Sequence, residues 1–169
     1  FLAGLSSLGK TTVIEPSLSR DHTERLLKYL GAEVITNQLP DLSWEIILQG
    51  MPELNPLDIS VPSDPSSAAF PIVTAIITPK SEVLVKNVCI NKLRIGLYKT
   101  LIEMGANIKF LNEREIDGEN IADISAKSSS LIGITVPKSR APSMIDEYPI
   151  LAVAASIANG VTIMEGVQE

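Results

Sequence analysis

The sequence contains an internal repeat. Its first copy is Ser19-Arg20-Asp21-His22-Thr23-Glu24-Arg25-Leu26-Leu27-Lys28-Tyr29-Leu30-Gly31-Ala32-Glu33-Val34, and it returns as Leu93-Arg94-Ile95-Gly96-Leu97-Tyr98-Lys99-Thr100-Leu101-Ile102-Glu103-Met104-Gly105-Ala106-Asn107-Ile108. Arg20 and Arg94 occupy the same position in the two copies. Each copy carries leucines at helical spacing and reaches a glycine, Gly31 or Gly105, where a left-handed residue ends a helix. The repeat therefore predicts two amphipathic helices in equivalent structural units.

Each predicted helix follows a run typical of a β-strand, and a third such run comes late in the chain. These runs are Thr11–Glu15, Glu82–Asn87 and Val161–Glu165. Apolar helices rich in small residues are predicted before them, at Phe1–Leu5, Ser66–Ile77 and Ile150–Ala158. Loops or hairpins are predicted at Gln38–Asp41, Gly50–Pro56, Asn112–Asn120 and Pro137–Pro142. Helices that alternate with short strands indicate an α/β fold with mixed sheets.

The sharpest break in the pattern is Pro62-Ser63-Asp64-Pro65. Because proline suits the first position of a helix and aspartate suits the position before it, we expect Asp64 to cap a helix that begins at Pro65. A short strand, Asp58–Val61, is predicted before this turn.

The composition excludes several classes of protein. A net charge of -6 offers no basic surface for a nucleic-acid backbone. The longest apolar stretch, Ser66–Ile77, is interrupted by Pro71 and is shorter than the roughly 20 residues that span a bilayer. The single cysteine, Cys89, rules out a disulfide within this chain and favours a reducing, cytoplasmic setting.

Four stretches together resemble the EPSP synthases. They are Glu15 to Arg25 (Glu-Pro-Ser-Leu-Ser-Arg-Asp-His-Thr-Glu-Arg), Val61 to Phe70 (Val-Pro-Ser-Asp-Pro-Ser-Ser-Ala-Ala-Phe), Asn91 with Arg94 and Gly96, and Ala141 to Leu151 (Ala-Pro-Ser-Met-Ile-Asp-Glu-Tyr-Pro-Ile-Leu). The second stretch also resembles a sister family that adds enolpyruvate to UDP-N-acetylglucosamine. That family usually has a catalytic loop cysteine, whereas Cys89 lies in an apolar run typical of inert packing.

The resemblance implies an enolpyruvyl transferase fold, in which repeated βαβαββ units form two lobes resembling an inverse α/β barrel. The active site would lie between the lobes, and only parts of each lobe would be present. Residues 1–61 are expected to be the C-terminal part of one lobe and residues 62–169 the central part of the second. The chain is thus expected to be an internal fragment of the enzyme.

The resemblance also implies the reaction. The enolpyruvyl group of phosphoenolpyruvate would pass to the 5-hydroxyl of 3-phosphoshikimate, in the shikimate pathway to chorismate and the aromatic amino acids. No metal, organic cofactor, nucleic acid or membrane is expected to take part, and the full-length enzyme is expected to be a cytoplasmic monomer. We expect the fragment alone to be inactive, because most anion-binding residues of the family lie outside it.

Asp146 is the predicted catalytic residue, as the general base that accepts the proton of the 5-hydroxyl. The alternative is a helix cap, because Ser143-x-x-Asp146 is also a capping-box pattern. Ser19, Arg20 and Asp146 are the predicted substrate-binding residues. Ser19 is also predicted as a helix N-cap and Arg20 as a first-turn residue of that helix, with an exposed surface arginine as the alternative.

Several other polar residues are expected to have structural roles. His22 is the only histidine, so a histidine pair for a metal and a serine–histidine–aspartate triad are both excluded within this chain. Arg94 is expected to form an ion pair, and Glu147 to be a solvated or capping carboxylate. A second alternative for the whole chain, a non-catalytic repeat domain that binds a partner, would be favoured by an exposed apolar face at Asp146.

Overall fold

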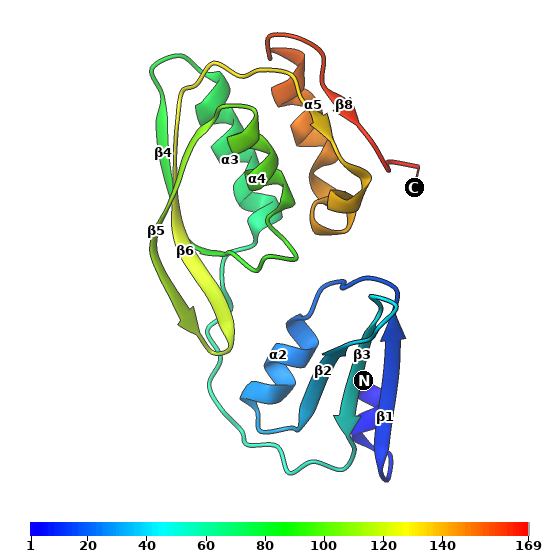
Figure 1. Cartoon of the computed structure of the whole chain (residues 1–169). Helices are drawn as coiled ribbons and strands as arrows, with labels where there is room; N and C mark the ends of the chain where they lie inside the picture. Colours follow the sequence, from blue (N-terminus) through cyan, green and yellow to red (C-terminus); the bar gives the residue numbers. More distant parts are fainter. Residues whose placement is uncertain (169) are drawn as a thin grey trace. The chain divides into compact units, whose positions relative to one another are not determined.

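The computed structural model describes residues 1–168, which form two compact units (Figure 1). The first unit contains Phe1–Ser60 together with Ile116–Glu119. The second contains Val61–Glu115 and the residues from Asn120 onward. Each unit has its own hydrophobic core, so each is described separately.

The first unit is a three-stranded antiparallel sheet with helices. Its elements are α1 (Leu2–Leu5), β1 (Lys10–Glu15), α2 (His22–Tyr29), β2 (Val34–Gln38) and β3 (Trp44–Gln49). The sheet order is β1-β3-β2, and β3 pairs antiparallel with both neighbours. Leu27 of α2 packs with Ile46 and Leu48 of β3 in the core, which gives the helix a buried face against the sheet.

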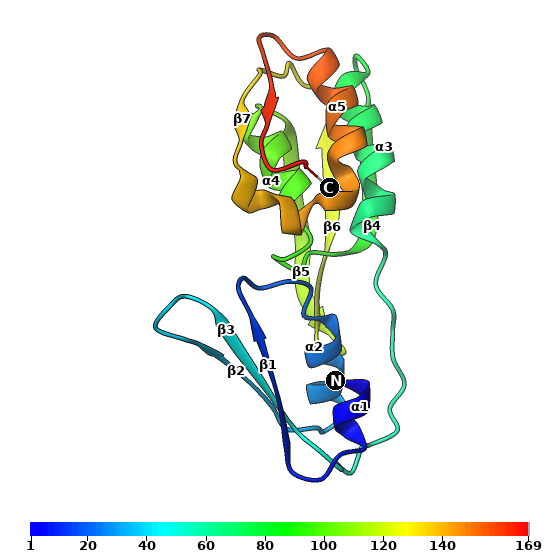
Figure 2. The same ribbon diagram turned by 90° about the vertical axis from the view of Figure 1, so that its right-hand side faces the viewer.

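The second unit repeats this plan and adds further elements. Its elements are α3 (Pro65–Ile77), β4 (Glu82–Cys89), α4 (Gly96–Glu103), β5 (Asn107–Ile116), β6 (Glu119–Lys127), β7 (Thr135–Val136), the 3-10 helices η1 (Lys138–Ser143) and η2 (Ile145–Glu147), α5 (Tyr148–Ser156) and β8 (Ile163–Met164). The sheet order is β4-β6-β5, and β7 pairs parallel with β8. The two views in Figures 1 and 2 show α3 and α5 side by side, in agreement with their contacts.

The predicted repeat is confirmed. Helices α2 and α4 contain eight residues each, and Gly31 and Gly105 after them adopt φ angles of 100° and 97°. These angles suit glycine because a Cβ atom is strained in the left-handed region. Both three-stranded sheets also place the third strand of the unit between the first two.

The predicted start of α3 is also confirmed. Asp64 is the N-cap, and its carboxylate accepts hydrogen bonds from the backbone N–H groups of Ser66 (3.2 Å) and Ser67 (2.9 Å). Pro65 follows as the first helical residue. The strand predicted at Asp58–Val61 is wrong, because these residues are irregular and lie outside the three described sheets.

The hairpin or loop predicted at Asn112–Asn120 is a hairpin, in which the ends of β5 and β6 flank a turn of Asp117 and Gly118 with φ angles of 52° and 83°. An Asp-Gly pair with positive φ angles is the usual tight connection of a hairpin. Two other local predictions need correction. The loop or hairpin predicted at Pro137–Pro142 is largely the 3-10 helix η1, and the strand predicted at Val161–Glu165 is reduced to Ile163–Met164.

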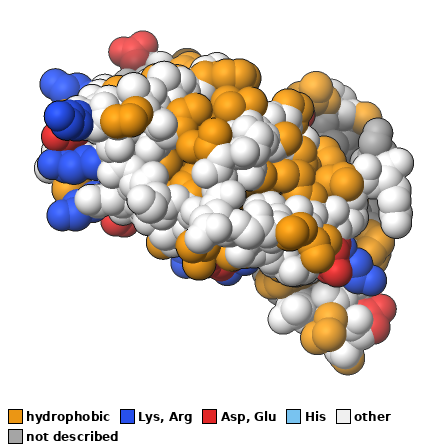
Figure 3. All heavy atoms as spheres, turned by 90° about the horizontal axis from the view of Figure 1, so that it is seen from above, with side chains coloured by type: hydrophobic (Ala, Val, Ile, Leu, Met, Phe, Trp, Pro, Cys, Tyr) orange, Lys and Arg blue, Asp and Glu red, His pale blue; other side chains and the backbone are white. Residues whose placement is uncertain are grey.

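Hydrophobic side chains also reach the surface. Figure 3 shows them gathered in patches on the face seen from above. In the second unit, Phe70 of α3 is 59% exposed, and Val153 and Ile157, in and directly after α5, are 45% and 53% exposed. Within residues 1–168, no helix combines the length and the apolar character needed to cross a membrane.

Candidate active site

Asp146 lies in η2, the short 3-10 helix that leads directly into α5. Its side chain is exposed, whereas Met144 and Glu147 on either side of it are 1% and 4% exposed. The backbone N–H of Glu147 donates to the carbonyl of Met144 over 3.0 Å and closes the turn around Asp146. The predicted base is thus a surface carboxylate between two buried anchors.

Helix α4 holds the residues that precede Asp146. The Arg140 guanidinium donates two hydrogen bonds to the Glu103 carboxylate, at 2.5 Å and 2.9 Å, and a third to Thr100 Oγ1 at 3.0 Å. These bonds from Arg140 hold the pKa of the Glu103 carboxyl below its usual value. Thr100 Oγ1 also lies 3.5 Å from Met144 Sδ. The segment is therefore tied to α4 at two points.

The first residue of α4 also approaches this segment closely. Gly96 is buried, and a Cβ atom added to it would overlap Ser143 Oγ and come within 3.0 Å of Met144 Cβ. The absence of a side chain at Gly96 therefore lets Ser143 and Met144 pack directly on the start of α4.

Glu147 is part of a polar network at the start of α3. Ser66 Oγ donates to Glu147 Oε1, and Arg94 Nη2 donates to Ser66 Oγ over 2.9 Å and to Asp64 Oδ1 over 3.1 Å. The ion pair predicted for Arg94 is therefore confirmed. Burial acts to raise the pKa of Asp64, but hydrogen bonds from Ser67 and Ser66 and the charge of Arg94 hold it below its usual value.

Two sequence predictions about this segment need correction. Glu147 is not a solvated carboxylate, because its side chain is buried against Ser66. The capping alternative holds in position only, since Glu147 is the N-cap residue of α5 but its side chain makes no capping hydrogen bond. The capping box predicted for Ser143 and Asp146 does not form, because Ser143 Oγ donates to the Arg140 carbonyl over 2.8 Å and the N-cap residue of α5 is Glu147. In a helix that began at Ser143, Pro149 would be an interior residue and would remove a backbone hydrogen bond, whereas in α5 it lies in the first turn, where proline is tolerated.

A pocket of about 400 Å³ lies beside η1 in the second unit. Three cationic side chains contribute to its lining, from Lys92, Lys99 and Arg140. Asp146 is not among the lining residues. An anion bound to these three cations would therefore not necessarily lie beside Asp146.

Ser19 and Arg20 belong to the first unit, in the exposed loop between β1 and α2. The predicted N-cap role of Ser19 is wrong, because its N–H and hydroxyl donate to the Glu15 carboxylate over 3.2 Å and 3.0 Å. Helix α2 begins at His22 with Asp21 as its N-cap, so Arg20 precedes the helix instead of lying in its first turn. The two bonds from Ser19 to Glu15, the last residue of β1, hold the loop between β1 and α2.

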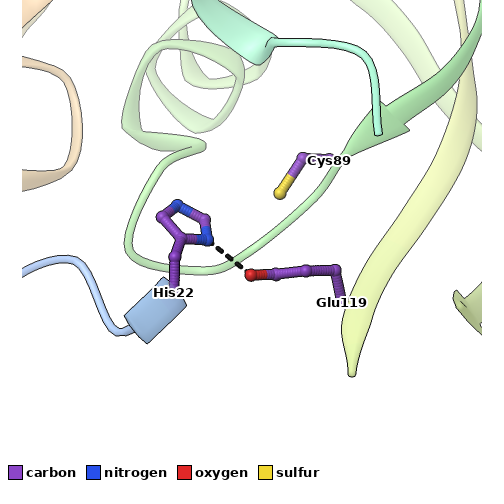
Figure 4. Close-up of side chains that lie close together, drawn as sticks. All are labelled: His22, Cys89 and Glu119. Atoms are coloured by element: carbon purple, nitrogen blue, oxygen red, sulfur yellow. Dashed lines mark hydrogen bonds and ion pairs between the residues drawn. The ribbon is translucent and has the colours of Figure 1, made fainter. Parts of the chain in front are cut away.

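His22 also belongs to the first unit, where its Nδ1 lies 2.5 Å from Glu119 Oε1 (Figure 4). This pairing agrees with the structural role predicted for the histidine. Cys89, in the second unit, is buried at the end of β4, as predicted from its apolar run.

Comparisons with known proteins agree over the whole chain. The family model of EPSP synthase (3-phosphoshikimate 1-carboxyvinyltransferase) matches residues 1–169. A 3-phosphoshikimate 1-carboxyvinyltransferase of Bartonella quintana is 54% identical over 168 residues, and one of Methylorubrum extorquens is 55% identical over 170 residues. Each alignment covers 99% of this chain and 38% of the relative.

Solved structures show the same relationship. EPSP synthase from Acinetobacter baumannii matches with a TM-score of 0.88 and 44% identity, over 96% of this chain and 36% of that one. The enolpyruvyl transferase NikO from Streptomyces tendae matches with a TM-score of 0.68 and 22% identity, over 96% of this chain and 37% of NikO, which supports the fold alone. The repeated units therefore define part of an enolpyruvyl transferase fold. Within that class, the chain belongs to the EPSP synthase family.

Proposed function

We propose that the full-length protein containing this chain is a 3-phosphoshikimate 1-carboxyvinyltransferase. It transfers the enolpyruvyl group of phosphoenolpyruvate to the 5-hydroxyl of 3-phosphoshikimate and releases phosphate. The proposal concerns the longer protein because this chain spans about 38% of the length of the curated relatives it matches. Family membership supports the proposed reaction. The observation that supports a catalytic role for Asp146 is its exposed carboxylate, on a turn that buried neighbours anchor.

Asp146 is the proposed general base. Its carboxylate accepts the proton of the 5-hydroxyl while that oxygen bonds to C2 of phosphoenolpyruvate, whose methylene carbon gains a proton. The tetrahedral adduct then loses phosphate and a proton from the new methyl group, which restores the double bond. A base for this step needs an ionised, accessible carboxylate, and Asp146 is exposed next to the start of α5, where the helix dipole favours negative charge.

Ser19 and Arg20 are proposed to bind the anionic substrate, with Asp146. Both lie exposed in a loop, where the Arg20 guanidinium is suited to a phosphate or a carboxylate. We further propose that residues 1–61 and 62–169 belong to the two lobes of the family fold, and that the full-length enzyme is a monomer. The proposed setting is the cytoplasm, where the enzyme would serve the pathway to chorismate and the aromatic amino acids.

The proposed function is tested on the full-length protein by phosphate release from phosphoenolpyruvate, with 3-phosphoshikimate or UDP-N-acetylglucosamine as the acceptor. We expect turnover with 3-phosphoshikimate. Asp146→Asn should lower kcat by about 100-fold or more while the fold persists, because an amide cannot accept the proton. Asp58→Asn is the matched control, since it makes the same change at an exposed aspartate of the first unit and should leave kcat unchanged.

Other outcomes would overturn parts of the proposal. Turnover with UDP-N-acetylglucosamine alone would assign the protein to the sister activity. Turnover with neither acceptor would contradict the proposed function. Full turnover of 3-phosphoshikimate by Asp146→Asn would support the function but show that Asp146 is not the base.

A further inference from the structure

We propose that Glu147 is a positioning residue for the reaction, which acts by fixing Asp146 through its contact with Ser66. The inference rests on the proposed function, since it requires Asp146 to be the base. It adds a role for Glu147, Ser66 and Arg94, which join the first turn of α3 to the turn that carries Asp146.

The burial of Glu147 needs an explanation. A carboxylate that is 4% exposed loses most of its hydration, which is costly unless hydrogen bonds replace it. Ser66 Oγ supplies one such bond, and Arg94 Nη2 donates to the same hydroxyl oxygen over 2.9 Å. The side chain of Arg94 is itself only 14% exposed. A positive charge therefore stands one hydroxyl group away from Glu147.

Tyr98 is a further polar group beside this network. Tyr98 is buried, and its hydroxyl donates to the Pro65 carbonyl over 2.6 Å. Burial raises the pKa of the Tyr98 phenol most, and the negative charges of Glu147 and Asp64 raise it further. The phenol thus stays protonated as a donor, while the Arg94 guanidinium bonds directly to Asp64 and reaches Glu147 through Ser66.

The geometry connects this network to Asp146. Glu147 follows Asp146 directly, within a turn of three residues, and its side chain is buried while that of Asp146 is exposed. With Met144 buried on one side and Glu147 bonded to α3 on the other, the backbone of Asp146 is fixed from both directions. A general base must lie within hydrogen-bond reach of the proton it accepts, and a displacement of about 1 Å can cost about 100-fold in rate.

The test uses the full-length protein and compares variants on both sides of the Ser66–Glu147 contact. Glu147→Ala and Ser66→Ala each remove the contact, whereas Glu147→Gln retains the length and an oxygen that accepts from Ser66. The double variant Ser66→Ala/Glu147→Ala tests whether the two residues act as one unit. Ser81→Ala is the matched control, because the Ser81 hydroxyl donates to Ala75 and Thr78 carbonyls at the opposite end of α3.

We expect kcat to fall about 10- to 100-fold in Glu147→Ala and in Ser66→Ala, with smaller changes in both KM values, since the base is misplaced while the substrates still bind. Glu147→Gln should recover most of the lost kcat. The double variant should be no slower than the slower single variant, and Ser81→Ala should match the wild type. Circular dichroism and thermal unfolding of every variant show whether a loss of kcat comes from a displaced Asp146 or from loss of the fold. Glu147→Gln and Ser66→Ala are the milder changes and keep the test usable if Glu147→Ala unfolds.

The inference fails if folded Glu147→Ala or Ser66→Ala turns over as fast as Ser81→Ala, or if the two losses multiply in the double variant. It also fails if Glu147→Gln is as slow as Glu147→Ala, because the hydrogen bond would then not carry the effect. A failure of the proposed function looks different: the wild type would then show no turnover with 3-phosphoshikimate, or Asp146→Asn would retain full kcat.

Discussion

Asp146 and Glu147 are adjacent acidic residues in opposite environments. Asp146 is exposed, and Glu147 is buried against Ser66. In a 3-10 turn, successive side chains point about 120° apart, so one residue can anchor the turn while its neighbour faces the solvent. This division is the residue-scale basis for the proposals that Asp146 is the general base and that Glu147 positions it.

Arg20 gives a second residue-scale prediction. If its guanidinium binds an anionic group of the substrate, Arg20→Gln in the full-length protein should raise the KM for 3-phosphoshikimate about 10-fold or more, through the loss of a charge-assisted hydrogen bond. Steady-state kinetics at saturating phosphoenolpyruvate measure this change. Lys28→Gln removes the same charge from an exposed position on α2 and serves as the control. Equal KM values in the two variants would return Arg20 to the role of a surface arginine.

At the scale of elements, the start of α4 and the 3-10 segment before α5 form one packed assembly. Gly96 admits Ser143 and Met144, and Glu103 and Thr100 bind Arg140. The turn that carries Asp146 is therefore placed by α4 on one side and by α3 on the other. A substitution at either contact should therefore displace Asp146, although neither contact involves the Asp146 side chain.

Gly96→Ala tests this assembly. The added Cβ would collide with Ser143 and Met144, so we expect a loss of about 1–3 kcal/mol in the free energy of unfolding, typical of overpacking, and a lower kcat. Gly105→Ala is the control, because its φ of 97° costs a similar ~1–2 kcal/mol but its Cβ would lie 3.4 Å from the nearest atom, the Ser130 carbonyl oxygen. Chemical denaturation of the full-length protein measures the free energy of unfolding of both variants, and steady-state kinetics measure their kcat. An unchanged kcat in a destabilised Gly96→Ala would argue that α4 does not position Asp146.

At the scale of the whole molecule, the two units share one plan. Each has a three-stranded antiparallel sheet with its third strand in the centre, and each has an eight-residue helix between its first two strands. The second unit adds α5 and the η1–η2 segment, which carry the candidate base. Ser19 and Arg20 come from the first unit and Asp146 from the second.

The 169-residue chain by itself should not catalyse the reaction. It spans about 38% of its relatives, and a transition state that gathers several negative charges needs a cluster of cations to stabilise it. Exposed hydrophobic residues such as Phe70 and Ile157 should also promote its association. Phosphate release by the isolated chain, compared with full-length protein at equal concentration, measures this. A rate above that of full-length Asp146→Asn would contradict the expectation.

Local sequence determined the repeat and the start of α3. The paired helices follow from leucine spacing and a terminal glycine, and the Asp64 cap follows from the neighbouring residues that it bonds. Such features involve residues a few positions apart, so residue type and spacing predict them. The burial of Glu147 depends instead on Ser66, 81 positions away in the chain. No local pattern encodes that contact, because it exists only once α3, α4 and α5 have packed around one core.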